Sequence, residues 1–69
     1  MLFLHWFDDS KRPADAKLAD ACAAYTRRFG APPNVALVNE ADAGAQADGV
    51  EVRVTGRIGK HNYQVGRDG

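Results

Sequence analysis

The chain has 69 residues, the length of one small domain, and its nine acidic and nine basic side chains give a formal net charge of zero. Duplex-DNA-binding proteins usually carry an excess of basic residues, so this balance argues against that class. The single cysteine, Cys22, excludes a disulfide within the chain and any zinc site built on two or more cysteines. A domain of this size buries only a small core, so we expect it to gain stability by self-association.

The first residues are apolar but differ from a signal peptide, because no basic segment precedes them and acidic residues follow at once. No stretch approaches the ~20 apolar residues that a membrane-spanning helix needs. We therefore expect a soluble cytoplasmic protein without membrane association.

The segment 2–7 (LFLHWF) is short, rich in aromatic residues and followed by the turn-forming sequence DDS, which predicts a β-strand. Both faces of this strand are largely apolar. One face carries Leu2, Leu4 and Trp6, and the other carries Phe3, His5 and Phe7. A strand that is apolar on both faces is typical of the middle of a sheet.

The segment from about residue 13 to 29 is predicted to be a helix. Asp9 or Ser10 is suited to capping its start, and Pro13 is tolerated in a first turn. Gly30 is suited to the left-handed conformation that ends a helix. An apolar stripe at helical spacing is expected to face the core, with Lys17 largely off it. The stripe comprises Ala14, Leu18, Ala21, Cys22, Tyr25 and Phe29.

The run 34–39 (NVALVN) is apolar and bounded by turn residues, which predicts a buried strand. The following segment, about 40–49, contains alanine, glycine and acidic residues but no large apolar side chain. We expect it to be a mobile loop that buries nothing. Its alanines would support a short helical turn, but its two glycines argue against a long helix.

The segment 50–55 (VEVRVT) alternates strictly, with its valines on one face, and 62–65 (NYQV) repeats the pattern more weakly. The residues between them, GRIGKH, are numerous enough for a glycine-containing turn. The sequence therefore predicts a C-terminal antiparallel β-hairpin.

The order of these elements, β-α-β-β-β, predicts one α+β domain over residues 1–69. In it, one helix packs on a four-stranded mixed sheet as two layers, with the first two strands made parallel by a right-handed crossover. One helix covers one face of a sheet, so the other face must meet water or a partner. We expect the side of the first strand that carries His5 to be this uncovered face.

Phe3, His5 and Phe7 are the candidate partner interface, because large apolar side chains on an uncovered sheet are typical of an interaction surface. The same aromatic residues beside Arg53 would also suit stacking of single-stranded nucleic-acid bases.

A second candidate site is the basic, glycine-spaced C-terminal segment, which would suit an anion or a nucleic acid. Its candidate contacts are Arg53, Arg57, Lys60, His61 and Arg67. The segment 56–60 (GRIGK) is not a Walker loop, since two residues rather than four separate its glycines and a strand follows.

No catalytic, metal-binding or cofactor-binding set of residues is expected. His5 and His61 are far apart in the sequence and lack metal-ligand spacing, and a thiol on a buried helix stripe, such as Cys22, is inert. The favoured hypothesis is a non-catalytic interaction module that forms a homo-oligomer or binds a protein partner. The alternatives are a single-stranded nucleic-acid or anion-binding domain, with nucleic acid the less favoured partner, and thirdly an enzyme whose site is shared between subunits.

Overall fold

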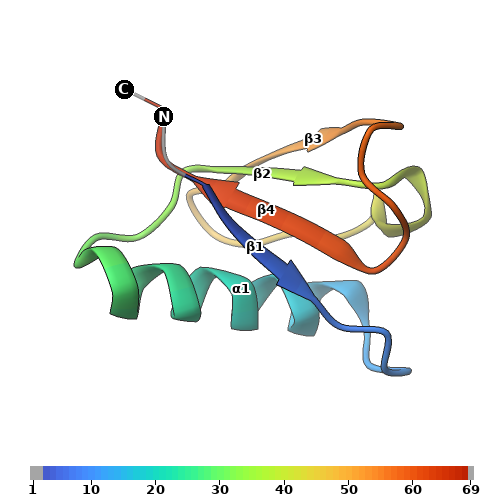
Figure 1. Ribbon diagram of the computed structural model, residues 1–69, viewed down its shortest axis with the longest axis horizontal. Helices are drawn as coiled ribbons and strands as arrows, with labels where there is room; N and C mark the ends of the chain where they lie inside the picture. The colour runs from blue at the N-terminus through green and yellow to red at the C-terminus, as the bar shows by residue number, and fades with distance from the viewer. Residues whose placement is uncertain (1–2, 69) are drawn as a thin grey trace.

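The computed structural model describes residues 3–68 and places one helix against a four-stranded mixed sheet (Figure 1). In chain order the elements are β1 (Phe3–Phe7), α1 (Ala14–Phe29), β2 (Val35–Val38), the 3-10 turn η1 (Glu40–Asp42), β3 (Glu51–Val54) and β4 (Asn62–Gly66). The predicted α+β class and order of elements are confirmed.

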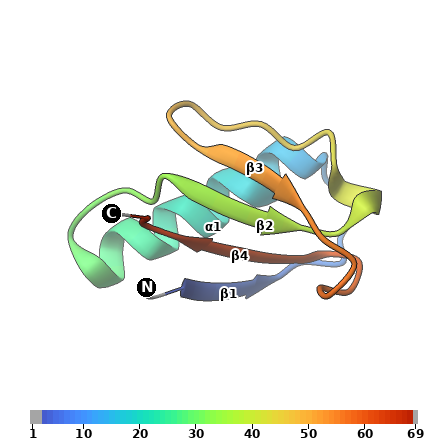
Figure 2. The same ribbon diagram turned by 90° about the horizontal axis from the view of Figure 1, so that it is seen from above.

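The strand order across the sheet is β1-β4-β2-β3 (Figure 2). β4 pairs antiparallel with both β1 and β2, and β2 pairs parallel with β3. β1 and β2 are therefore parallel to each other, with β4 inserted between them.

This order makes two expectations wrong. β1 is an edge strand rather than a middle one, and β3 and β4 are not paired as a hairpin. The burial of the strands explains the arrangement: Tyr63 and Val65 of β4 are completely buried, whereas Val54 of β3 is 47% exposed. The strand with the larger buried side chains occupies the centre, where both neighbours and the helix cover it.

Helix α1 ends as the sequence predicts, but it begins differently. Gly30 is left-handed (φ 77°), and its amide donates to the carbonyl of Thr26 at 2.9 Å. At the start, Pro13 precedes the helix and no side chain caps it, so the expected caps Asp9 and Ser10 are wrong. Instead, the Asp8 carboxylate accepts from the Ser10 amide at 2.9 Å, which forms a tight turn before the helix.

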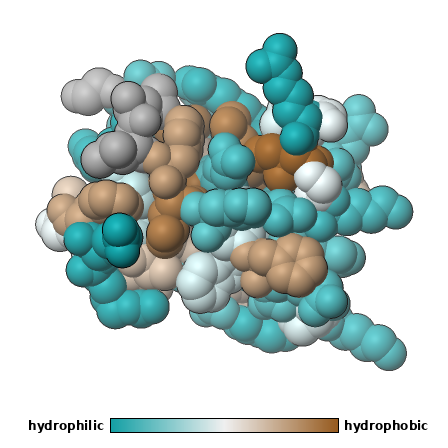
Figure 3. Space-filling model, viewed as in Figure 1, coloured by the Kyte–Doolittle hydropathy of each residue, from teal (hydrophilic) through white to brown (hydrophobic). Residues whose placement is uncertain are grey.

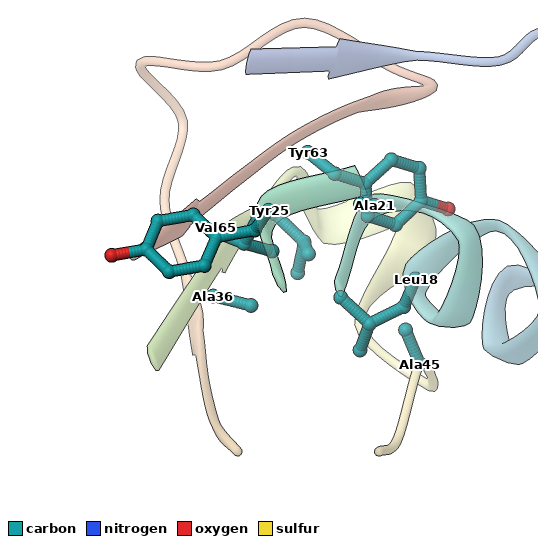
Figure 4. Close-up of a cluster of buried hydrophobic side chains, with 8 residues drawn as sticks. Leu18, Ala21, Tyr25, Ala36, Ala45, Tyr63 and Val65 are labelled. Carbon is teal, nitrogen blue, oxygen red and sulfur yellow. The ribbon is translucent and has the colours of Figure 1, made fainter. Parts of the chain in front are cut away.

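The core lies between α1 and the sheet and contains both small and large side chains (Figure 4). The two tyrosine rings lie at opposite ends of the cluster, with their hydroxyls directed away from it. Its buried members are Leu18, Ala21, Tyr25, Ala36, Val38, Ala45, Tyr63 and Val65. Phe29, expected in the helix stripe, is 37% exposed, although its ring packs against that of Tyr25 in a tilted arrangement, at a centroid distance of 4.6 Å.

The connection between β2 and β3 contributes to this core, so the expectation that it buries nothing is wrong. Ala45 is 2% exposed and belongs to the same cluster as Leu18 and Tyr63. The amide of Gln46 also donates to the carboxylate of Asp15 on α1 at 2.8 Å. The methyl group of an alanine is enough to fill the space here because the backbone itself passes close to the helix. Mobility of this segment remains a prediction.

Candidate functional site

In the part of the chain that the structure describes, one face of the sheet has no helix on it, and we call it the open face. Figure 2 looks onto this face, with α1 behind the sheet. Its members follow from the strand pairing, because successive side chains point to opposite faces and the core takes the other set. They are Phe3, His5 and Phe7 of β1, Asn62, Gln64 and Gly66 of β4, Val35 and Leu37 of β2, and Glu51 and Arg53 of β3. Val35 is 1% exposed, so the face is covered around this residue.

β1 divides its side chains as the alternation predicts. Leu4 and Trp6 pack against the core, while Phe3 is 37% and Phe7 60% exposed on the open face. Figure 3, with the β1 edge towards the viewer, shows apolar groups as separate brown patches among polar side chains. Phe7 is the most exposed of the large apolar side chains among residues 3–68.

His5 is the polar member of this row and is held in place by β4. Its Nε2 lies 2.6 Å from Oδ1 of Asn62, and since an amide oxygen only accepts, the imidazole donates. The Asn62 amide nitrogen in turn donates to the carbonyls of Gly59 and Lys60, at 3.3 and 3.0 Å. These bonds fix the His5 ring between Phe3 and Phe7 and tie β1 to the β3–β4 connection.

The β3–β4 connection forms a hollow on the open face, beside β2 and β4. The hollow has a volume of about 350 Å³ and is lined by Leu37, Thr55, Arg57, Ile58 and Gln64. Ile58 is 8% exposed, and the amide nitrogen of Asn39 donates to its carbonyl at 2.6 Å. The open face therefore has an exposed aromatic ring on one side of β4 and, on the other, a depression lined by both apolar and polar side chains.

The five basic candidates are not gathered into one cationic surface. Arg53 is paired with Glu51 and, at 3.5 Å, with Asp68; the hydrogen bond to Glu51 is the main reason that its pKa is raised. Arg67 donates to the carbonyl of Pro32 at 2.6 Å.

The other three basic candidates lie on the β3–β4 connection, and their positions diverge. Arg57 lines the hollow and Lys60 is exposed, and within residues 3–68 neither side chain forms an ion pair. His61 faces the helix instead of the open face, because its Nδ1 lies 3.2 Å from Nζ of Lys17.

His61 belongs to a polar cluster that the sequence analysis missed. Lys17 of α1 is 3% exposed, and Asp42 of η1 is 5% exposed. The Asp42 carboxylate accepts from the Tyr63 hydroxyl and from the His61 amide, both at 3.0 Å. Burial, followed by the bond to Asp42, raises the pKa of Tyr63 well above its ordinary value.

A sequence signal for part of this cluster exists. Lys17 lies four residues before Ala21 and eight before Tyr25, so it lies on the same buried side of the helix. The expectation that Lys17 lies largely off the stripe is therefore wrong. His61 has no comparable signal. Its backbone is left-handed (φ 67°), a conformation that costs a non-glycine residue energy and depends on the surrounding contacts.

This cluster is better suited to stabilising the fold than to catalysis, because its donors and acceptors bind one another beneath the surface. Cys22 is half-buried, and burial raises its pKa, which disfavours the reactive thiolate. A second hollow, of about 400 Å³, lies between the 43–50 segment and β3 and is lined by alanine, valine and one glutamine.

Among residues 3–68, no group of three or more His, Cys, Asp or Glu side chains is arranged to hold a metal ion. The same part of the chain has no helix that is both long and apolar enough to cross a membrane. Comparison with known proteins found no matching family model, no matching curated protein and no matching solved structure.

Proposed function

We propose that this protein is a non-catalytic interaction module that self-associates through its open face. The observation that carries the proposal is the row formed by Phe3, His5 and Phe7, which β1 presents on a sheet face that no helix covers. Phe7 in particular is 60% exposed. Fully burying such a side chain contributes roughly 1.5–3 kcal/mol, so a partner surface that covers it gains affinity directly.

The size and charge of the chain support a second copy as the partner. A domain of 69 residues has a thin stability margin, and covering its uncovered sheet face enlarges the buried core. With a formal net charge of zero, two copies do not repel each other as highly charged proteins do.

Sedimentation equilibrium from micromolar to sub-millimolar protein tests this proposal. We expect the wild type to dimerise and both Phe3→Asp and Phe7→Asp to shift it towards monomer, because a carboxylate cannot be buried unpaired. The matched control is Val54→Asp, since Val54 is also an exposed apolar strand residue (47%) but shares the face of Val52, opposite to the open face. A wild type that stays monomeric, or a dimer that both open-face variants leave unchanged, would refute the proposal.

A second candidate function is binding of single-stranded nucleic acid or another anion. The observation in its favour is that Arg57 and Lys60 lie on one exposed connection with no ion pair among residues 3–68, and that Arg57 borders the hollow. Fluorescence anisotropy with a labelled oligonucleotide at low salt would detect such binding, which should weaken as salt rises. Absence of binding, or binding that Arg57→Ala and Lys60→Ala leave unchanged, would eliminate this candidate.

A further inference from the structure

We infer that two copies of the chain pack open face to open face, with the Phe7 ring of each copy seated in the hollow of the other. This inference rests on the proposed self-association and specifies its geometry. It joins two observations on the same face of the sheet: a ring that is 60% exposed, and a hollow of about 350 Å³ whose apolar lining comes from Leu37 and Ile58. Within residues 3–68 of one copy, neither feature has an occupant or a cover.

The ring and the hollow lie at the same end of the sheet, on opposite sides of β4. Phe7, the last residue of β1, pairs with Asn62, the first residue of β4, and the connection that carries Ile58 leads into that end of β4 (Figure 2). Phe7 and Leu37 lie on strands two spacings apart, and Phe7 is also two residues along the sheet from the level of Leu37, so more than about 10 Å separates them. A ring therefore cannot fill the hollow of its own copy without displacing β1.

A two-fold axis between the two faces, directed along β4, brings each ring over the hollow of the other copy. The operation exchanges the two sides of β4, so the β1 side of one copy meets the β2 side of the other. The resulting contact is isologous: the same pair of surface features meets twice, as closed dimers require. Two sheets stacked in this way form a sandwich whose strands remain roughly aligned.

The polar side chains of the open face are compatible with this geometry. Gln64 lies on the axis, and its carboxamide is both a donor and an acceptor, so it can pair with the same group in the second copy. Glu51 and Arg53 lie on β3, beyond the edge strand of the facing copy. Charged residues therefore remain at the hydrated rim, as in other protein interfaces.

The size of the face sets the expected affinity. The molecule measures 28 × 20 × 18 Å, and the face seen in Figure 2 spans its longest and shortest dimensions, 28 × 18 Å, or about 500 Å² in projection. This is an upper limit, and it lies below the roughly 800 Å² that a standard interface buries on each partner, in the range of weak interfaces. We expect a micromolar dimer in which Phe7 is a dominant contact, so that Phe7→Ala weakens dimerisation by roughly tenfold or more.

The native protein offers a direct test, because Ile58 is the single isoleucine of the chain. One deuterated pool carries ¹³C-labelled, protonated isoleucine methyl groups, and a second deuterated pool carries protonated phenylalanine. When equal amounts are mixed, a nuclear Overhauser effect between a phenylalanine ring and the Ile58 methyl arises only between copies. Repeating the mixture with Phe3→Leu, Phe7→Leu or Phe29→Leu in the phenylalanine pool assigns the ring.

We expect the effect in the wild-type mixture, its persistence with Phe3→Leu and Phe29→Leu, and its loss with Phe7→Leu. A dimer by sedimentation that is weakened by Phe3→Asp and Phe7→Asp but gives no such effect, for example one in which the open faces pack with a different axis, overturns the inference and leaves the proposed self-association standing. A protein that stays monomeric at the concentration of the experiment overturns both.

Discussion

The side-chain nitrogen of Lys17 lies 3.2 Å from Nδ1 of His61, and this contact joins the first turn of α1 to the residue that precedes β4. An ammonium group has donors and no acceptor, so Nδ1 must accept and the imidazole proton resides on Nε2. Lys17 is 3% exposed, which means that its aliphatic stem is packed along its length. The contact therefore combines packing with one polar interaction between segments 44 residues apart.

Variants of Lys17 separate these two contributions. Lys17→Ala removes both the stem and the amine, and we expect it to lower the free energy of unfolding by about 2–3 kcal/mol. Lys17→Met keeps most of the stem and should cost about 1 kcal/mol or less, because an apolar replacement avoids burying a charge. Urea denaturation followed by circular dichroism measures the difference. Equal losses for the two variants would show that the stem does not contribute.

The left-handed backbone of His61 makes a second prediction. His61→Ala and His61→Gly both remove the imidazole, but only glycine adopts φ 67° without strain. We expect the glycine variant to be the more stable of the two by about 1 kcal/mol, despite the greater flexibility of its unfolded chain. Chemical denaturation of the pair tests this. The reverse order would mean that the backbone relaxes when the side chain is removed.

The Tyr63 hydroxyl donates to the buried carboxylate of Asp42, so Tyr63→Phe leaves that carboxylate with one donor fewer. We expect a loss of about 1–3 kcal/mol. Asp42→Asn retains an acceptor and should cost less than Asp42→Ala, which removes the acceptor for both Tyr63 and the His61 amide. Thermal or urea unfolding of the three variants gives the ranking.

The raised pKa of Tyr63 also predicts a dependence on alkaline pH. The folded pKa lies above the ordinary value of 10.0, so the stabilisation is complete below pH 10 and is lost as the pH rises through the folded pKa. The wild type should therefore lose stability relative to Tyr63→Phe above pH 10. Absorbance of tyrosinate, compared between the two proteins, should place the ionisation of Tyr63 above pH 10. A midpoint at or below pH 10 would contradict the effect of burial.

The hydrogen bonds of Asp8 predict how the stability of the protein depends on acidic pH. Hydrogen bonds from the Ser10 side chain and then from its backbone amide lower the pKa of Asp8 below its ordinary value of 3.8. A lowered carboxyl pKa gives stabilisation that is present above pH 3.8 and is lost as the pH falls through the folded pKa. A ¹³C NMR titration of the Asp8 carboxyl should show a midpoint below pH 3.8 in the wild type, and a higher midpoint in Ser10→Ala. Ser10→Thr, which keeps the hydroxyl, is the control and should titrate like the wild type.

The buried position of Ala45 predicts a contrast between two alanines of one segment. Ala45 is 2% exposed in the core cluster, whereas Ala43 is exposed. Ala45→Leu should cost about 1–3 kcal/mol by overpacking, and Ala43→Leu should change stability by less than about 0.5 kcal/mol. Two equally mild effects would indicate that the 43–50 segment detaches easily from the helix.

The elements that follow from local patterns could be predicted from the sequence. The spacing of Leu18, Ala21 and Tyr25 defines the helix, and Gly30 ends it, because both signals act within a few residues. The alternation in β1 predicts that Phe3, His5 and Phe7 share a face, and one helix can cover only one face of a sheet. The position of Phe3, His5 and Phe7 on the open face could therefore be predicted from the sequence.

The polar cluster and the strand order could not be predicted from the sequence in the same way. Lys17, Asp42 and His61 come from three separate segments, and no pattern in the local sequence predicts that these residues are in contact. Similarly, the alternation of Tyr63 and Val65 shows only that β4 is a strand with one buried face. It does not say that β4 lies between β1 and β2.

By itself, then, the sequence determined the type and order of the elements and which side chains of β1 lie on the face opposite to the helix, since periodicity is a local property. Only the tertiary structure decided that β4 inserts between β1 and β2, that Ala45 completes the core, and that Phe7 and the Ile58 hollow share one face. These outcomes depend on which distant segments bury the most surface together, and that is a property of the folded chain as a whole.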